Sequence, residues 1–305
     1  MKSPLQQLLL LALCATLLAC AKPSPVSVSD GRVEAFPQMG GKYLSARNVT
    51  VWIPDAYDRG DTCDVLYMHD GQMLFDSTST WNHQEWQVDE VAGRLIKEGK
   101  MRPTIIVGID NDDSERLNDY YPQRVVEYVD SALREQINPN RFHADAYLRF
   151  IVEELKPMID SRYRVHTDAA HTFIMGSSMG GLISLYALCE YPNVFGGAAC
   201  MSTHLPLMLP NALGNPQFDH EPVAEAFRAY VANTLPTNSK LLYMDRGTET
   251  VDTNYVAYQD AFDQMMKNKQ WDTAHYRSLV FNGHAHDEIS WARRLDQPFL
   301  FLLAK

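Results

Sequence analysis

The stretch that decides the fold reads TFIMGSSMGGLISLYALCEYP, residues 172–192. It opens with a short apolar run typical of a strand buried on both faces, and it closes as a helix-like segment that stops before a proline. Between the two, GSSMG at 176–180 matches G-x-S-x-G in the strand–turn–helix context of a nucleophile elbow. Glycines leave the room that such a tight turn needs. The pattern predicts that Ser178 stands at the apex of the turn as a nucleophile.

Further apolar runs, each bounded by turn residues, lie on both sides of this stretch. Helical periodicity separates them, most clearly over 144–159 and 256–266. This alternation predicts an α/β fold, a mostly parallel central sheet with helices on both faces. Ligands bind at the carboxyl ends of the strands in such sheets. The expected strands are 49–54, 64–69, 104–109, 172–175, 197–201, 240–244 and 276–281.

A serine hydroxyl is a weak nucleophile, so Ser178 needs a histidine base and a carboxylate that orients the base. In folds with this elbow the acid and then the histidine follow the serine along the chain. The segment after the last expected strand supplies His284 and His286. They are two residues apart, so only one of them need face the serine.

The acid is expected on the loop 245–252, which offers three carboxylates. Asp245 belongs to the end of the strand and is expected to pair with Arg246 or another neighbour, so it ranks third. Glu249 lies close to the glycine turn and has the longer reach. Asp252 lies just before the next expected helix, where it is either the acid or a helix cap. We choose Asp252 and keep Glu249 as the alternative.

Two backbone N–H groups are needed to bind the negative oxygen that develops on an attacked carbonyl. One is expected from Met179, the residue after the nucleophile. The other is expected from the loop after the strand 64–69, where Gly71 permits a close backbone approach and Gln72 is our choice of donor.

Composition sets limits on the partners. The chain has 305 residues, 46% of them hydrophobic, and a formal net charge of −11, which argues against a nucleic-acid partner because phosphate contact needs a basic face. His284 and His286 lack further ligands at a recognisable metal spacing, so we expect neither a metal nor another cofactor. The catalytic domain is expected to span residues 36–305.

The first 35 residues have a different character. Residues 1–19 have the proportions of a signal peptide, and the sequence LLAC at 17–20 resembles a bacterial lipobox that leaves Cys20 as the lipidated first residue. The alternative is an ordinary secretory signal with a chance cysteine. The Pro- and Ser-rich stretch that follows predicts a tether over 20–35. We therefore expect a domain anchored by lipid to a membrane, and Ala21 after Cys20 favours the outer membrane.

Three cysteines remain for the domain, Cys63, Cys189 and Cys200. An odd number permits at most one disulfide and leaves one thiol over. Cys189 and Cys200 have the setting of small buried hydrophobic residues, the usual state of a free cysteine.

Taken together, these motifs resemble the putative-esterase family, which includes feruloyl and acetylxylan esterases, S-formylglutathione hydrolases, enterochelin esterases and mycolyltransferases. The resemblance runs from about Val49 to the C-terminus and implies an α/β-hydrolase fold. It favours His286 over His284 as the base. Many members have the acid closer to the glycine than Asp252 lies, so the choice between Asp252 and Glu249 stays open. The segments that carry it are 67–72, 150–160, 176–181, 247–248 and 286–288, with Trp291.

The resemblance implies a serine esterase that works through an acyl-enzyme, with a small-molecule or polysaccharide-linked substrate such as a carbohydrate-linked acyl ester or a siderophore ester. Two alternatives are an acyltransferase of the same fold and a surface-binding lipoprotein without catalysis. Aromatic residues after the strands are candidates for the substrate pocket, although packing in the core explains them equally well. These candidates are Trp81, His83, Trp86, Tyr120 and Tyr121.

Overall fold

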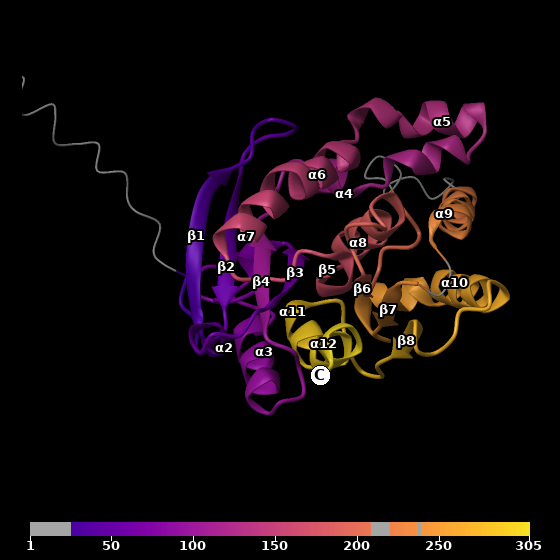
Figure 1. The fold of residues 1–305 in the computed structure, drawn as a ribbon. Helices are drawn as coiled ribbons and strands as arrows, with labels where there is room; N and C mark the ends of the chain where they lie inside the picture. The colour runs from indigo at the N-terminus through magenta and orange to yellow at the C-terminus, as the bar shows by residue number, and fades with distance from the viewer. Residues whose placement is uncertain (1–25, 209–219, 237–238) are drawn as a thin grey trace, which may run out of the picture.

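The computed structural model describes residues 26–208, 220–236 and 239–305, and its centre is one eight-stranded sheet (Figure 1). The strand order is β1-β2-β4-β3-β5-β6-β7-β8. The first two strands run antiparallel to their neighbours, and all pairs from β4 to β8 are parallel. The strands are β1 (Arg32–Met39), β2 (Arg47–Ile53), β3 (Asp64–His69), β4 (Thr104–Ile109), β5 (Thr172–Ser177), β6 (Gly197–Met201), β7 (Leu241–Arg246) and β8 (Tyr276–Val280).

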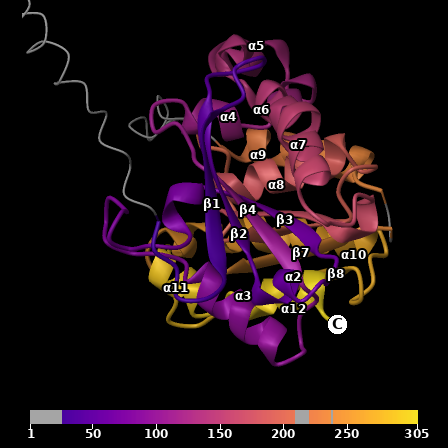
Figure 2. The ribbon, with the colours of Figure 1, turned by 60° about the vertical axis from the view of Figure 1, so that its left-hand side comes forward.

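Helices cover both faces of this sheet, as Figures 1 and 2 show. One face packs against α6, α8, α9 and α10, and the other packs against α3 and α12, so the molecule has two separate hydrophobic cores. The predicted α/β architecture is therefore confirmed. The helices are α2 (Asp55–Asp58), α3 (Val88–Lys97), α4 (Arg116–Tyr120), α5 (Ser131–Ile137), α6 (Ala144–Phe150), α7 (Lys156–Arg162), α8 (Met179–Glu190), α9 (Glu221–Thr234), α10 (Val256–Asn268), α11 (Glu288–Ala292) and α12 (Asp296–Leu303).

Helix α8 follows the G-x-S-x-G motif and lies at the centre of the molecule. Eleven of its residues, Met179 to Cys189, are buried. A helix that is apolar on all sides is stable only where neighbours cover it completely, and here β5, β6, α4 and α9 do so. The start of this helix is therefore held rigidly beside the carboxyl end of β5.

The structure differs from the sequence-based expectations at two places. The segment predicted as one helix over 144–159 is α6 and α7 joined by a turn of π-helix at Ile151–Leu155. The strand β1 was missed, and its first residues fall inside the predicted tether 20–35. Ser29 also donates from its backbone N–H to Asp89 over 2.7 Å. Within the described residues, this part of the tether therefore belongs to the folded domain.

The structure shows the state of the three cysteines predicted for the domain. Cys63, Cys189 and Cys200 are buried and unpaired. Among the described helices, none is both long and apolar enough to cross a bilayer. The predicted signal peptide over 1–19 and the predicted lipidation site Cys20 lie outside the described residues.

Parallel strands end at the same edge of a sheet, and in this protein the loops after β3, β5, β6 and β7 meet there. These loops begin at Asp70, Ser178, Ser202 and Gly247. The fold thus gathers the polar residues predicted from the sequence at one edge.

Candidate active site

Ser178 occupies a strained turn between β5 and α8. Its backbone φ is 55° and its ψ is −119°, a conformation that a residue with a side chain rarely adopts. The turn is possible because Gly176 and Gly180 touch: a Cβ on Gly176 would lie 2.7 Å from the carbonyl carbon of Gly180. The turn is further fixed by the Ser178 N–H, which donates to the carbonyl of Met201 over 2.9 Å. This is the geometry of a nucleophile elbow, and it exposes the serine at the edge of the sheet.

Asp252 and His286 form a pair in which the aspartate is buried and the histidine is part-buried. His286 Nδ1 lies 2.6 Å from Asp252 Oδ1, and the aspartate side chain is fully buried. The other oxygen of Asp252 accepts from the hydroxyl of Ser202 and from the backbone N–H of Gly247, both over 2.6 Å. Burial on its own would raise the pKa of Asp252, but the hydrogen bonds from His286 and Ser202 hold it below its usual value. The carboxylate is therefore ionised and fixes the orientation of the histidine ring.

The three carboxylates of the loop after β7 have different surroundings. Glu249 is exposed. Asp245 is buried and accepts hydrogen bonds from Arg294, at 3.1 and 3.2 Å, and from its neighbour Tyr243 over 2.9 Å, so these residues and not Arg246 pair with it. Asp252 accepts from the Gly247 N–H, which precedes it, and not from a helix N–H, so it is not a helix cap. The structure thus brings Asp252 to His286.

The backbone of this loop depends on a second glycine. A Cβ on Gly247 would lie 2.1 Å from the carbonyl oxygen of His284. That same carbonyl accepts the N–H groups of Thr248 and Glu249, each over 3.1 Å. The ring of His284 turns away from the pair, and its Nδ1 lies 3.2 Å from the carbonyl of Ser290. His284 therefore joins the loops after β7 and β8, and His286 carries the contact with the acid.

The two predicted oxyanion donors lie in the expected loops. Met179 is the first residue of α8, and Gln72 lies in a short 3-10 helix, Gly71–Met73, directly after β3. Within the described part of the chain, neither N–H donates to a backbone carbonyl outside its own helix. Gly71 packs against β4, because a Cβ there would lie 2.6 Å from the backbone of Gly108. Packing thus fixes the loop that carries Gln72.

A part-buried ion pair supports the loop after β3. Arg116 donates to both oxygens of Asp70 over 2.7 Å, and Asn111 adds a third hydrogen bond over 2.6 Å. Burial opposes ionisation of Asp70, but the Arg116 guanidinium holds its pKa below the usual value. Asp70 has a positive φ of 57°. The ion pair therefore stabilises a strained residue next to the predicted oxyanion donor.

A pocket of about 510 Å³ opens over Ser178 and His286. Of the predicted aromatic residues, Trp81 and Trp86 line it, and Trp291 adds a third indole. Trp81 is 82% exposed, which is exceptional for so large an apolar side chain. The other candidates do not line this pocket: Tyr120 and Tyr121 are buried in the core, and His83 lies on the surface beside a different hollow.

Sequence reasoning missed several polar residues around the pair. Ser202 contacts Asp252 and accepts hydrogen bonds from Trp291 over 3.1 Å and from Arg294 over 2.8 Å. Tyr255 and His204 lie beside His286 and Ser178. The sequence does contain one indication, because Ser202 follows the strand β6 directly, at the edge where ligands bind.

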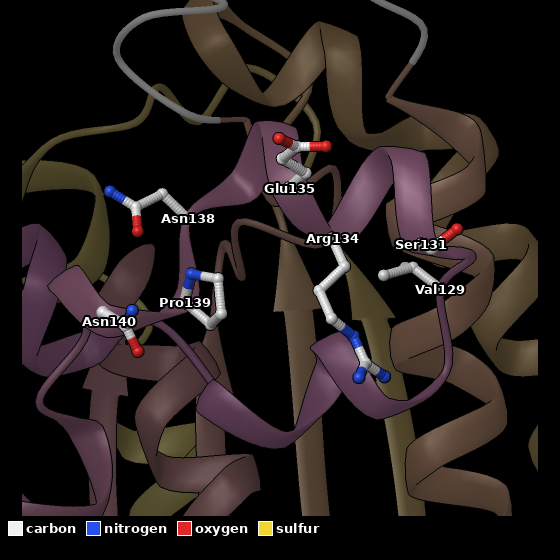
Figure 3. A pocket seen from close by; sticks show the side chains of 7 residues that line it. All are labelled: Val129, Ser131, Arg134, Glu135, Asn138, Pro139 and Asn140. Carbon is white, nitrogen blue, oxygen red and sulfur yellow. The ribbon is translucent and has the colours of Figure 1, made fainter.

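Two other features lie apart from this pocket. The hollow in Figure 3, of about 530 Å³, is formed by α5 and the turn after it, and its lining includes Arg134 and Glu135 but no serine–histidine pair. Among the described residues, Asp64, His166 and His171 form a group that could hold a metal, with ligand atoms within 4.8 Å of one another. That group lies at the amino ends of β3 and β5, the edge opposite Ser178.

The chain is similar to several known proteins. The family model described as "Putative esterase" matches residues 43–302. The ferri-bacillibactin esterase BesA of Bacillus subtilis (strain 168) is 27% identical over 136 residues, which cover 43% of this chain and 44% of that protein. The chain matches about half the length of its curated relatives.

Solved structures extend the likeness over most of the chain. A ferulic acid esterase superposes with a TM-score of 0.64 and 21% identity, covering 89% of this chain and 98% of that one. An enterobactin esterase from Shigella flexneri superposes with a TM-score of 0.65 and 16% identity, covering 91% and 60%. These structures show the α/β-hydrolase fold. Because the family model spans most of the sequence, the chain belongs to the Putative esterase family.

Proposed function

We propose that this protein hydrolyses carboxylic esters through a covalent acyl-enzyme on Ser178, with His286 as general base and Asp252 as the orienting acid. One observation carries the proposal: the Asp252–His286 pair and the strained Ser178 lie at the same edge of the sheet, and Ser178 and His286 line one pocket. A serine hydroxyl is a weak nucleophile, and it needs a base and a carboxylate that orients the base, the roles that we propose for His286 and Asp252.

In the acylation half-reaction, Ser178 Oγ attacks the ester carbonyl and its proton passes to His286 Nε2. The carbonyl oxygen becomes negative and accepts hydrogen bonds from the N–H groups of Met179 and Gln72. The C–O bond to the alcohol then breaks, and His286 gives its proton to the departing alcohol. In the second half-reaction water attacks the acyl-enzyme by the same route, and the proton returns to Ser178. Asp252 stays ionised throughout and stabilises the imidazolium of His286.

The pocket favours a neutral ester over an anionic one. Its lining includes the carboxylates of Asp113, Asp287 and Glu288 in addition to the paired Asp70, against the single cation Arg116. The chain as a whole has a net charge of −11. This excess of negative charge repels an anionic ferric catecholate complex, the ligand type of a siderophore esterase. We therefore propose an acyl ester of a neutral carbohydrate as the substrate class.

The exposed Trp81 at the pocket supports the same choice. Its side chain is 82% exposed, and it lies beside the pocket that Trp86 and Trp291 line from within. An exposed indole offers an apolar face on which a sugar ring can pack, and exposed aromatic residues of this kind mark binding sites.

We also propose that the chain is a lipoprotein, lipidated at Cys20 and held at the outer membrane. The support is the signal-like segment 1–19 and the lipobox-like sequence that ends at Cys20. The lipid anchor and the residues before Val26, which packs against the core, would then hold the domain close to the membrane.

A substrate panel tests the proposed chemistry and substrate class together. Acetylated and feruloylated xylo-oligosaccharides, p-nitrophenyl acetate and a ferric catecholate triester would be offered to the wild type and to Ser178→Ala. We expect kcat/KM to be highest for an oligosaccharide ester and to fall by about 10⁴-fold or more in the variant. A higher kcat/KM for the ferric catecholate would overturn the substrate class, and wild-type rates in Ser178→Ala would overturn the mechanism.

A further inference from the structure

Two histidines and an aspartate meet at the edge of the sheet opposite Ser178. Asp64 is the first residue of β3, His166 follows α7, and His171 directly precedes β5. One ligand atom from each of these three residues lies within 4.8 Å of the other two. Two imidazole nitrogens and a carboxylate oxygen are a donor set that suits zinc. No short motif indicates this group, because Asp64 lies far from the two histidines along the chain.

The backbone holds the three positions together. The N–H of His166 donates over 2.9 Å to the carbonyl of Cys63, the residue before Asp64. Because β3 and β5 are parallel neighbours in register, Asp64 and His171 stand side by side where the two strands begin. The rings of His166 and His171 stack, with centroids 4.3 Å apart and planes at 29°. The sheet itself therefore brings the three side chains together.

A second aspartate orients one of the histidines. Both oxygens of Asp168 lie 2.9 Å from Nδ1 of His171. A carboxylate only accepts, so in the neutral ring Nδ1 carries the proton and Nε2 keeps its lone pair. Histidines that bind a metal almost always donate their other N–H to a carboxylate or a carbonyl, which fixes the ring and its tautomer. His171 thus has the arrangement of a metal ligand.

The charge at Asp64 favours a cation. Its side chain is 4% exposed, and Nη1 of Arg102 lies 2.8 Å from Oδ2. Burial nevertheless keeps the pKa of Asp64 above its usual value, so Arg102 compensates the buried charge only in part. The carboxylate has a second oxygen, Oδ1, and a cation bound there would offset more of the cost of burial. Cys63 does not compete as a ligand, because burial raises the pKa of its thiol to about 12.

We propose that Asp64, His166 and His171 bind one Zn²⁺ ion, with water in the fourth position. Tetrahedral zinc with bonds of about 2.0–2.2 Å holds its ligand atoms about 3.4 Å apart. The side chain of His171 is 32% exposed, so its ring can close on the ion while Asp64 stays in place. The ion links the start of β3 to the start of β5, the strand that leads to Ser178. It stabilises the fold and takes no part in the proposed ester hydrolysis, because it lies at the opposite edge of the sheet.

Zinc binding by the untagged full-length protein tests the site. After dialysis against a chelator, calorimetric titration with Zn²⁺ should show one ion per chain. Tm should rise as zinc is added, because an ion that binds the folded state stabilises it. His166→Ala and His171→Ala should each weaken binding by about 10-fold or more, and Asp168→Ala by about 10-fold. X-ray absorption should show only nitrogen and oxygen ligands, at about 2.0–2.2 Å.

His275→Ala is the matched control. Nδ1 of His275 lies 2.8 Å from Oδ1 of Asp272, the same pairing at the same spacing as in His171 and Asp168, but His275 does not belong to the group of possible metal ligands. This variant should bind zinc as tightly as the wild type, and so should Ser178→Ala, whether or not the proposed esterase function holds.

Three results would overturn the proposal. They are a wild type that binds no zinc, an affinity that survives in both His166→Ala and His171→Ala, and a sulfur ligand in the absorption spectrum. The zinc-free variants should unfold at the Tm of the zinc-free wild type, which separates loss of the ion from loss of the fold. Hydrolysis of p-nitrophenyl acetate should be equal with and without the chelator, and a loss of activity on chelation would contradict the structural role.

Discussion

Asp252 Oδ1 lies 2.6 Å from Nδ1 of His286, and this contact joins two loops that follow neighbouring parallel strands, β7 and β8. The aspartate is fully buried, and three donors surround its two oxygens. A buried carboxylate with this many donors is held in one orientation, so it also fixes the tautomer of the histidine.

The first prediction compares two carboxylates of the same loop. Asp252→Asn should lower kcat by about 10²–10⁴-fold, because an amide in place of the carboxylate favours the wrong tautomer of His286. Glu249→Gln is the matched control, since Glu249 is exposed, and it should change kcat less than tenfold. Steady-state kinetics with p-nitrophenyl acetate measure both. The reverse order of the two variants would transfer the role to Glu249.

The second prediction concerns the glycines of the elbow. An alanine Cβ at Gly176 would lie 2.7 Å from backbone atoms of Gly180, whereas one at Gly180 would meet only side-chain atoms of Asp70 and His69, at 3.3 and 3.4 Å. Gly176→Ala should therefore lower the free energy of unfolding by about 1–3 kcal/mol, the cost of overpacking, and Gly180→Ala should lower it less. Urea denaturation measures both, and equal losses would show that the close approach is not essential.

The third prediction concerns pH and His69. This side chain is buried, and burial lowers its pKa to about 3, while an unfolded histidine titrates near 6.5. The unfolded state thus binds more protons between these values, so His69 destabilises the fold as the pH falls below 6.5, by about 2 kcal/mol at pH 5. Between pH 7 and pH 5 the wild type should lose more stability than His69→Gln. Parallel losses in the two proteins would contradict this.

The sequence predicts the centre of the fold well, for physical reasons. Buried parallel strands are nearly continuous apolar runs, and seven of the eight strands were found in this way. The antiparallel edge strand β1 was missed because its burial is partial and its residues alternate in character, RVEAFPQM. Its first residues continue the Pro- and Ser-rich segment, so composition alone assigned them to a tether.

The site was only partly predictable for a related reason. G-x-S-x-G is a local pattern, so Ser178 and Met179 follow from the sequence, while contacts between distant loops do not. The distance of Asp252 from the glycine could not decide between it and Glu249, because the 3-10 helix at Thr250–Tyr255 turns the aspartate inward. Ser202 depends on the meeting of β6 with the loop after β7, which only the folded chain shows.

A fourth prediction addresses the proposed anchor at Cys20, which precedes the described residues. Full-length protein expressed in a Gram-negative host should fractionate with the outer membrane and carry acyl mass on its first residue. Cys20→Ala should block processing or release a soluble form, because no thiol remains to be lipidated. Wild-type protein found wholly soluble in the periplasm would refute the anchor.

The central claim is that Ser178 is the covalent nucleophile, and active-site titration with a fluorophosphonate tests it most directly. The account predicts one phosphonyl group per wild-type chain, on the peptide that contains Ser178. Ser177→Ala should still be labelled, since Ser177 lies in the strand before the apex, and Ser178→Ala should not. Folded wild-type protein that takes up no label, or equal labelling of Ser178→Ala, would contradict the account.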